Sequence, residues 1–205
     1  ATGWLSSKYC VSGTCLNFKG DEAGAALAYV NTSDTGKLPL FTLSVWVYNV
    51  SGGDGRHSML RNFWEIVGNN VCFYSYCFGA NCDYNSTTDY WRCSIGSKIK
   101  YNKWIYVTTV WDGTYISHYI NGEFNWKDTK ATIGTSENFH HIAGYAYNTD
   151  RRRMKGRLDE MIIYNKNLSL SEIRQNYVAG LDSLLAQGGI CKEEYNERLK
   201  NLAGK

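Results

Sequence analysis

Long apolar runs, net charge and internal repeats are scarce or missing in this sequence. No run reaches the roughly 18 apolar residues that span a bilayer, so we expect no transmembrane helix in it. The 205 residues carry a formal charge of only +3 at pH 7, which argues against a general nucleic-acid-binding protein. No repeat or low-complexity linker divides the chain, and its length predicts one large domain with a small appendage.

Aromatic residues and glycine are abundant instead. Sixteen tyrosines, seven tryptophans and seven phenylalanines make up 15% of the chain, and such residues favour the half-buried surface of a β-strand. The 20 glycines suit the tight turns that join short strands. Proline occurs once, at Pro39, just before the first clear strand pattern. The composition therefore favours an all-β protein.

The strongest strand patterns lie in the middle of the sequence. Residues 41–48 alternate Phe, Leu and two valines with Thr, Ser, Trp and Tyr. This alternation predicts a central strand that packs one face into the core and offers the other for packing as well. Further strands are predicted over 104–111, 115–120 and 157–164.

Two dipeptides predict tight connections between these strands. Asp112-Gly113 and Asn121-Gly122 each suit a two-residue hairpin turn, because glycine tolerates the positive φ angles that such turns need. Two successive hairpins make a meander. No segment before residue 168 shows sustained helical periodicity, so the pattern predicts a β-sandwich or barrel rather than a parallel α/β sheet.

The pattern changes to helical periodicity near the end of the sequence. Ser169 and Glu172 form a capping box that begins a helix. We expect Gly180 to bend or interrupt this helix, and Gly188-Gly189 to end it. A second helix is predicted over 192–203, with apolar residues on one face. The apolar stripe of this helical hairpin must pack either on the sandwich or on another subunit.

The seven cysteines indicate an oxidising compartment. Six of them fall in three close intervals, which are disulfide candidates whose connectivity the spacing leaves open: Cys10 and Cys15, Cys72 and Cys77, Cys82 and Cys93. No partner pair with zinc-knuckle spacing completes a metal site around them. Cys191 is left over, as a free thiol or an intermolecular bridge.

Glycosylation acceptor sequences support the same location. Four of them are present, at Asn31, Asn49, Asn85 and Asn167. Each pattern alone is weak, but together with the cysteines they predict an extracellular or cell-surface protein.

Three pairs of segments, in this order, resemble the laminin-G-like, pentraxin-like branch of the concanavalin A-type sandwiches. They are 13–20 with 41–47, 103–113 with 119–122, and 156–164 with 168–173. The resemblance extends over roughly residues 13–177. It implies a two-sheet antiparallel jelly-roll sandwich, which we assign to residues 1–178, followed by a short C-terminal helical tail at 179–205.

The same resemblance implies carbohydrate or protein recognition, often with a structural calcium ion. Calcium takes roughly six to eight oxygen ligands, so several carboxylates must converge on it. By resemblance, the candidate ligands are Asp21, Glu22 and Asp159. The sequence departs from the family pattern at Lys19, where relatives often have an acidic residue before the glycine.

A sugar site needs exposed aromatic faces for stacking and polar groups that fix the sugar's orientation. The aromatic candidates lie in the cysteine-rich segment and near later turns: Tyr74, Tyr76, Tyr84, Tyr90, Trp91, Trp126, Tyr145 and Tyr147. The run 151–157 concentrates five positive charges, of which Arg151, Arg152 and Arg153 are candidates for contact with the sulfate or carboxylate groups of an acidic glycan, or with an acidic face of a neighbouring subunit.

We expect no enzymatic activity. Glycosidases need two carboxylates set about 5–9 Å apart, whereas Asp159 and Glu160 are adjacent in a strand and point to opposite faces. The leading hypothesis is a secreted, non-catalytic recognition domain that binds glycan or a cell-surface or matrix protein. The alternative is a structural subunit of an extracellular filament, pilus or surface layer, which would oligomerise.

Overall fold

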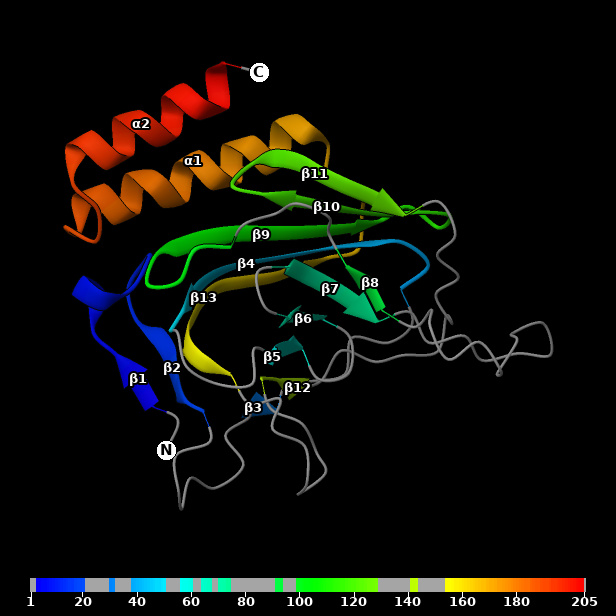
Figure 1. Ribbon diagram of the computed structural model, residues 1–205, viewed down its shortest axis with the longest axis horizontal. Coiled ribbons are helices and arrows are strands. Elements are labelled where there is room, and N and C mark those ends of the chain that lie inside the picture. Colours follow the sequence, from blue (N-terminus) through cyan, green and yellow to red (C-terminus); the bar gives the residue numbers. More distant parts are fainter. Residues whose placement is uncertain are drawn as a thin grey trace.

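The computed structural model describes residues 3–20, 30–31, 38–50, 56–60, 64–67, 70–74, 91–93, 99–128, 141–143 and 154–204. It has three layers, in which two helices, a large sheet and a smaller sheet are stacked (Figure 1). The strands are β1 (Gly3–Leu5), β2 (Cys15–Lys19), β3 (Val30–Asn31), β4 (Phe41–Asn49), β5 (Arg56–Leu60), β6 (Trp64–Val67), β7 (Asn70–Tyr74), β8 (Trp91–Cys93), β9 (Trp104–Trp111), β10 (Ile116–Ile120), β11 (Glu123–Asp128), β12 (His141–Ile142) and β13 (Lys155–Tyr164). The helices are the 3-10 helix η1 (Ser7–Tyr9), α1 (Leu170–Ala186) and α2 (Lys192–Ala203).

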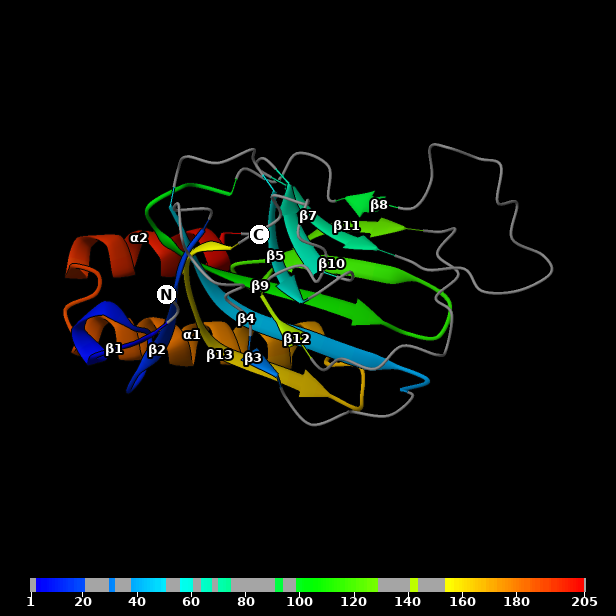
Figure 2. The same cartoon turned by 90° about the horizontal axis from the view of Figure 1, so that it is seen from below.

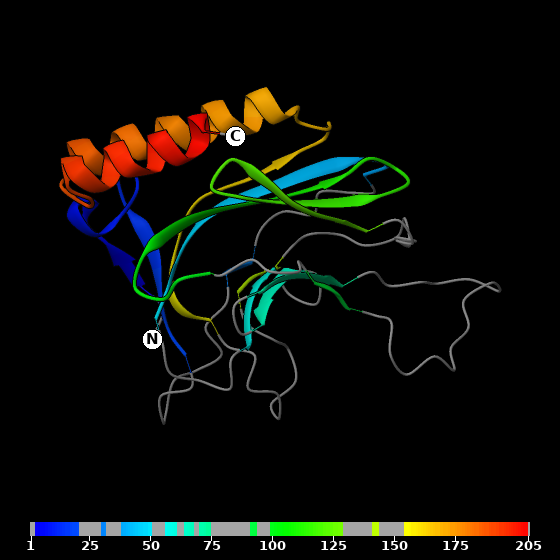
Figure 3. The same ribbon diagram turned by 45° about the horizontal axis from the view of Figure 1, so that its top comes forward.

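Both sheets are antiparallel. The larger has seven strands in the order β1-β2-β13-β4-β9-β10-β11, and the smaller has six in the order β3-β12-β5-β6-β7-β8. The larger sheet carries the smaller sheet on one face and the helices on the other (Figure 3). The predicted two-sheet antiparallel sandwich with a C-terminal helical hairpin is confirmed.

Strand β4 lies at the centre of the larger sheet, between β13 and β9. Its alternate residues Phe41, Leu43, Val45 and Val47 pack into the core between the two sheets. The intervening Trp46 packs into a second apolar cluster, beneath the helices. The predicted central strand is therefore confirmed, and both of its faces are buried.

The meander of β9, β10 and β11 is also present. Asn121 and Gly122 both have positive φ, at 53° and 77°, as a two-residue hairpin turn requires. The turn after β9 differs from the prediction, because β10 begins only at Ile116. The Asp112 side chain accepts hydrogen bonds from the amides of Thr114 (2.8 Å) and Tyr115 (2.6 Å), which closes a longer turn over 112–115.

Helix α1 begins at the predicted capping box, in which Ser169 and Glu172 satisfy each other's backbone amides. The pKa of Glu172 is lowered to about 2, mainly because Lys166 donates a hydrogen bond to its carboxylate and, to a smaller extent, because Ser169 donates further ones. The prediction that Gly180 interrupts the helix is wrong, because α1 continues to Ala186. A Cβ atom at Gly180 would lie 2.5 Å from Cε2 of Trp46, so glycine here allows the helix to approach the sheet closely.

Helix α2 folds back along α1 and packs on the sandwich. Tyr195, Leu199 and Leu202 contact the apolar cluster beneath the helices, and Arg198 donates a 2.9 Å hydrogen bond to the carbonyl of Trp104 in β9. The helical tail therefore packs on its own sandwich. The boundary predicted between residues 178 and 179 falls inside α1. In the described part of the chain, neither helix has the length and apolar character needed to cross a membrane.

Candidate functional site

A short loop at one end of the larger sheet is closed by a disulfide between Cys10 and Cys15. The loop joins η1 to β2 and lies at the same end of the molecule as the turn between α1 and α2 (Figure 2). Gln187 in that turn donates a 2.8 Å hydrogen bond to the Val11 carbonyl. Both cysteines were disulfide candidates whose connectivity the sequence left open, and the structure pairs them with each other.

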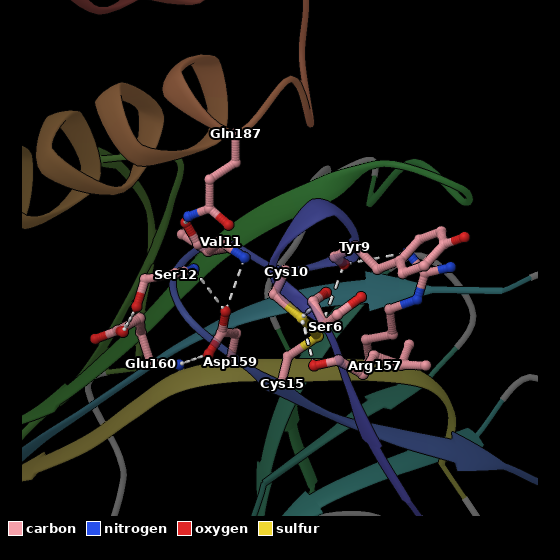
Figure 4. The surroundings of a disulfide bond; sticks show 11 residues. Ser6, Tyr9, Cys10, Val11, Ser12, Cys15, Arg157, Asp159, Glu160 and Gln187 are labelled. Carbon is pink, nitrogen blue, oxygen red and sulfur yellow. Dashed lines mark hydrogen bonds between the residues drawn. A yellow bond between two sulfur atoms is a disulfide. The ribbon is translucent and has the colours of Figure 1, made fainter.

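The buried carboxylate of Asp159 holds this loop against β13 (Figure 4). One oxygen accepts hydrogen bonds from the amides of Val11 (2.7 Å) and Ser12 (2.9 Å), and the other accepts from the amide of Glu160 (2.9 Å). Burial raises the pKa of Asp159, while the three amide donors oppose that rise. These contacts give Asp159 a structural role as the anchor of the loop.

Asp159 is also the one predicted calcium ligand within the described residues. Its carboxylate lies within 4.8 Å of both loop sulfurs, but those sulfurs are joined in a disulfide and offer no thiolate to a metal. Asp21 and Glu22 lie outside the described residues. Calcium binding therefore stays a prediction.

Removal of the Cys10–Cys15 disulfide is expected to destabilise the fold modestly. A loop this short yields about 2 kcal/mol of stabilisation through restriction of the unfolded chain. The Cys10→Ala/Cys15→Ala double variant should therefore show a free energy of unfolding in urea lower by about that amount. Cys191→Ser is the control, because Cys191 is free and exposed; equal stability of the two variants would contradict the structural role of the bridge.

Next to this loop, Arg157 of β13 contacts two tyrosine rings. Its Cζ atom lies 4.4 Å from the ring centroid of Tyr48 and 5.4 Å from that of Tyr9. One of its terminal nitrogens donates a 3.3 Å hydrogen bond to the Tyr9 carbonyl. No carboxylate pairs with Arg157 in the part of the chain that the structure describes, and its guanidinium group carries several N–H donors. We call Tyr9, Tyr48 and Arg157 the arginine–tyrosine cluster.

Further polar and basic residues flank this cluster on the same face of the sheet. Asn17 of β2 lies directly opposite Arg157, and Lys19 lies opposite Lys155 two positions along. Side chains two positions apart in a strand share one face. The ammonium group of Lys8 lies 4.8 Å from the centroid of the Tyr9 ring. The described part of this surface is thus positively charged and contains two aromatic rings.

The residues that the sequence predicted to bind a glycan do not belong to the arginine–tyrosine cluster. Tyr74 and Trp91 occupy paired backbone positions in β7 and β8. Trp126 stacks on the buried ring of His118, with centroids 5.9 Å apart. The remaining candidates lie outside the described residues: Tyr76, Tyr84, Tyr90, Tyr145, Tyr147, Arg151, Arg152 and Arg153. None of the described candidates lies in the arginine–tyrosine cluster.

The other predicted disulfides and glycosylation sites have mixed outcomes. Cys72 is disulfide-bonded and lies directly opposite Cys93, while Cys77, Cys82 and Asn85 lie outside the described residues. Glycosylation at Asn49 is wrong for the folded protein, because its side chain in β4 is fully buried. Asn167 is exposed between β13 and α1, and Asn31 lies in β3.

The chain belongs to the concanavalin A-like lectin/glucanases superfamily, whose family model matches residues 20–174. This match confirms the resemblance on which the fold prediction rested. No curated protein matches the sequence.

Solved structures share the fold at low sequence identity. Domain 4 of an extracellular arabinanase from Geobacillus stearothermophilus, in complex with arabinotriose, is 15% identical with a TM-score of 0.58, over 85% of this chain and 80% of that one. A heptameric SAP-like pentraxin from Limulus polyphemus is 10% identical with a TM-score of 0.57, over 77% and 78%. The ligand-binding domain of botulinum neurotoxin serotype D, in complex with N-acetylneuraminic acid, is 16% identical with a TM-score of 0.51, over 75% and 40%. The chain thus spans less than half of the neurotoxin domain.

Proposed function

We propose that this protein is an extracellular, non-catalytic domain that binds glycans bearing carboxylate or sulfate groups, and that the arginine–tyrosine cluster is the binding site. The observation that carries this proposal is Arg157, which two tyrosine rings and a carbonyl orient while no described carboxylate neutralises it. A guanidinium group recognises carboxylate and sulfate through paired N–H donors.

The surroundings of Arg157 suit a sugar as well as its anionic group. Tyr9 is 41% exposed, so the part of its ring that Lys8 and Arg157 leave uncovered offers apolar surface to a pyranose. Asn17, opposite Arg157, adds amide donors and acceptors for sugar hydroxyls. Exposed Lys19 extends the positive surface along β2, which favours a ligand with more than one negative group.

The non-catalytic part of the proposal is supported by the carboxylates that the structure describes near the site. A glycosidase needs one carboxyl group as the acid and another as the nucleophile or base. Asp159 accepts three backbone hydrogen bonds within the fold, so it is committed to the loop. Among the described residues, Glu160 is the exposed carboxylate beside it.

A glycan array probed with the intact chain tests the proposal. The array should pair sulfated, uronate-containing and sialylated glycans with the same glycans after removal of their sulfate or carboxylate groups. We expect binding to acidic members and at least tenfold weaker binding to their neutral counterparts. Equal binding to both, or no binding, would overturn the proposal. A parallel array with a chelator tests the calcium prediction separately.

Assembly into a filament, pilus or surface layer is the second candidate. It is favoured by Cys191, which is free and exposed at the start of α2, since an unpaired cysteine in an extracellular protein can bridge two chains. Light scattering of native protein with and without reductant separates the two candidates. A regular polymer that binds no glycan would favour assembly.

A further inference from the structure

The two tyrosines of the arginine–tyrosine cluster are held beside Arg157 by different parts of the fold. Tyr48 lies in β4 directly opposite Arg157 in β13, so the pairing of two central strands brings these two residues together. Tyr9 lies in the short helix η1, which belongs to neither sheet. The place of its ring beside Arg157 therefore depends on what holds η1.

Helix η1 leads directly into the disulfide loop, which Asp159 attaches to β13 (Figure 4). The amide of Cys10, the first residue after η1, donates a 2.9 Å hydrogen bond back to a carbonyl oxygen of η1, so the loop and η1 are joined. The next two amides, those of Val11 and Ser12, donate to the Asp159 carboxylate. Asp159 and Arg157 are two positions apart in β13 and share one face of the strand.

The two loop amides need the acceptor that Asp159 supplies. Val11 is fully buried, and a buried backbone amide without a partner is unfavourable. The Ser12 hydroxyl also donates to the Glu160 carboxylate, but that contact between side chains gives the amides no acceptor. Without the Asp159 carboxylate, the loop would have to move outward until water reached these amides, and η1 would move with it.

Such a movement would carry two groups away from Arg157. The Tyr9 carbonyl accepts a 3.3 Å hydrogen bond from Arg157, and the Tyr9 ring centroid lies 5.4 Å from the guanidinium carbon. Lys8, in the same short helix, places its ammonium group 4.8 Å from the centroid of that ring. Helix η1 in its present place therefore brings both an aromatic ring and a second positive charge to the cluster.

We infer that Asp159 is a positioning residue for the arginine–tyrosine cluster. Its carboxylate holds the disulfide loop so that Tyr9 and Lys8 lie beside Arg157 before a ligand arrives, and it acts through the loop rather than by contact with the ligand. Groups that are already ordered raise affinity, because binding does not have to order them. The inference rests on the proposed function for its effect on binding, whereas the positioning of Tyr9 is observable without any ligand.

Electrostatic attraction alone predicts the opposite effect of this carboxylate. Asp159 places a negative charge two residues from Arg157, so its removal should strengthen the attraction of a sulfate or carboxylate group. Two variants separate the explanations, since both remove the charge. Asp159→Asn keeps one acceptor oxygen that can face the two loop amides, whereas Asp159→Ala keeps none.

NMR of the ligand-free full chain measures the positioning, through nuclear Overhauser contacts between the Arg157 side chain and the two tyrosine rings. We expect contacts with both Tyr9 and Tyr48 in the parent protein and in Asp159→Asn. In Asp159→Ala the contact with Tyr9 should be lost, while the contact with Tyr48 remains and shows that the strands are still paired. If Asp159→Ala does not fold, Gln187→Ala replaces it, because it removes the hydrogen bond that holds the loop from the helix side without a change of charge; it should weaken the Tyr9 contact.

Titration calorimetry with a sulfated, uronate-containing oligosaccharide measures the effect on binding. We expect Asp159→Ala to weaken binding about three- to tenfold, the cost of ordering one or two side chains, and Asp159→Asn to bind at least as tightly as the parent protein. The inference is overturned if the variant that folds, Asp159→Ala or its replacement Gln187→Ala, retains the Tyr9 contact in full, or if Asp159→Ala binds as tightly as Asp159→Asn. A parent protein that binds no acidic oligosaccharide would instead overturn the proposed function, and the ligand-free contacts would still decide whether Asp159 positions Tyr9.

Discussion

Replacement of Gly156 by alanine is expected to lower the free energy of unfolding by about 3–5 kcal/mol, the largest stability change that we predict for one residue. Gly156 lies in β13 with a φ of +144°, in the region of backbone space that L side chains rarely adopt. A Cβ atom there would overlap the carbonyl oxygen of Tyr48 and lie 3.1 Å from its carbonyl carbon. These atoms belong to the main chain of the central strand β4, so they cannot move without breaking the pairing of β4 with β13.

Urea unfolding followed by circular dichroism measures this change. Gly3→Ala is the matched control, because its added Cβ atom would meet nothing within 4 Å, and it should stay within about 0.5 kcal/mol of the parent protein. Gly180→Ala should fall between the two, since its clash is with the Trp46 side chain, which can tilt. A Gly156→Ala protein as stable as Gly3→Ala would contradict the packing of β13 against β4.

Replacement of Arg157 by alanine is expected to weaken acidic-glycan binding by about 2 kcal/mol or more, which is roughly thirtyfold. The alanine variant loses the paired N–H donors and leaves the anionic group without a counter-charge. Arg157→Lys keeps the charge but loses the planar guanidinium that contacts Tyr9 and Tyr48. We therefore expect an intermediate loss for lysine.

Titration calorimetry measures these affinities. The salt concentration is held fixed, because exposed charge interactions weaken as ionic strength rises. Lys192→Ala is the control: it removes one positive charge from an exposed position at the start of α2, an element that contributes no residue to the cluster, and should bind like the parent protein. Circular dichroism verifies that each variant remains folded. If Arg157→Ala and Lys192→Ala bind acidic glycans equally well, Arg157 is not the binding residue.

Short sequence patterns predicted those features of the fold that a few consecutive residues determine. The alternation in β4, the positive φ angles of Asn121 and Gly122, and the capping box at Ser169 each follow from a few consecutive residues. The Cys10–Cys15 bridge spans only five positions. Such features need no knowledge of which strands become neighbours.

The candidate site could not be predicted this way, because it depends on long-range pairing. Arg157 contacts Tyr9 across 148 positions of sequence, and this contact exists only because β2 pairs with β13. The basic run 151–157 predicted contact with an anionic group. It did not indicate that Arg157, rather than its neighbours, contacts the rings of Tyr9 and Tyr48. The sequon at Asn49 misled for a related reason, since a three-residue pattern does not show that its strand is buried on both faces.

The most direct test is an NMR titration that follows the side-chain Nε–Hε resonance of Arg157, assigned by its disappearance in Arg157→Lys. If this guanidinium binds the negatively charged group of the sugar, the resonance shifts and saturates as a sulfated or carboxylated oligosaccharide is added. The resonance does not shift when the uncharged form of the same oligosaccharide is added. A resonance that does not move while the acidic oligosaccharide demonstrably binds would contradict the account.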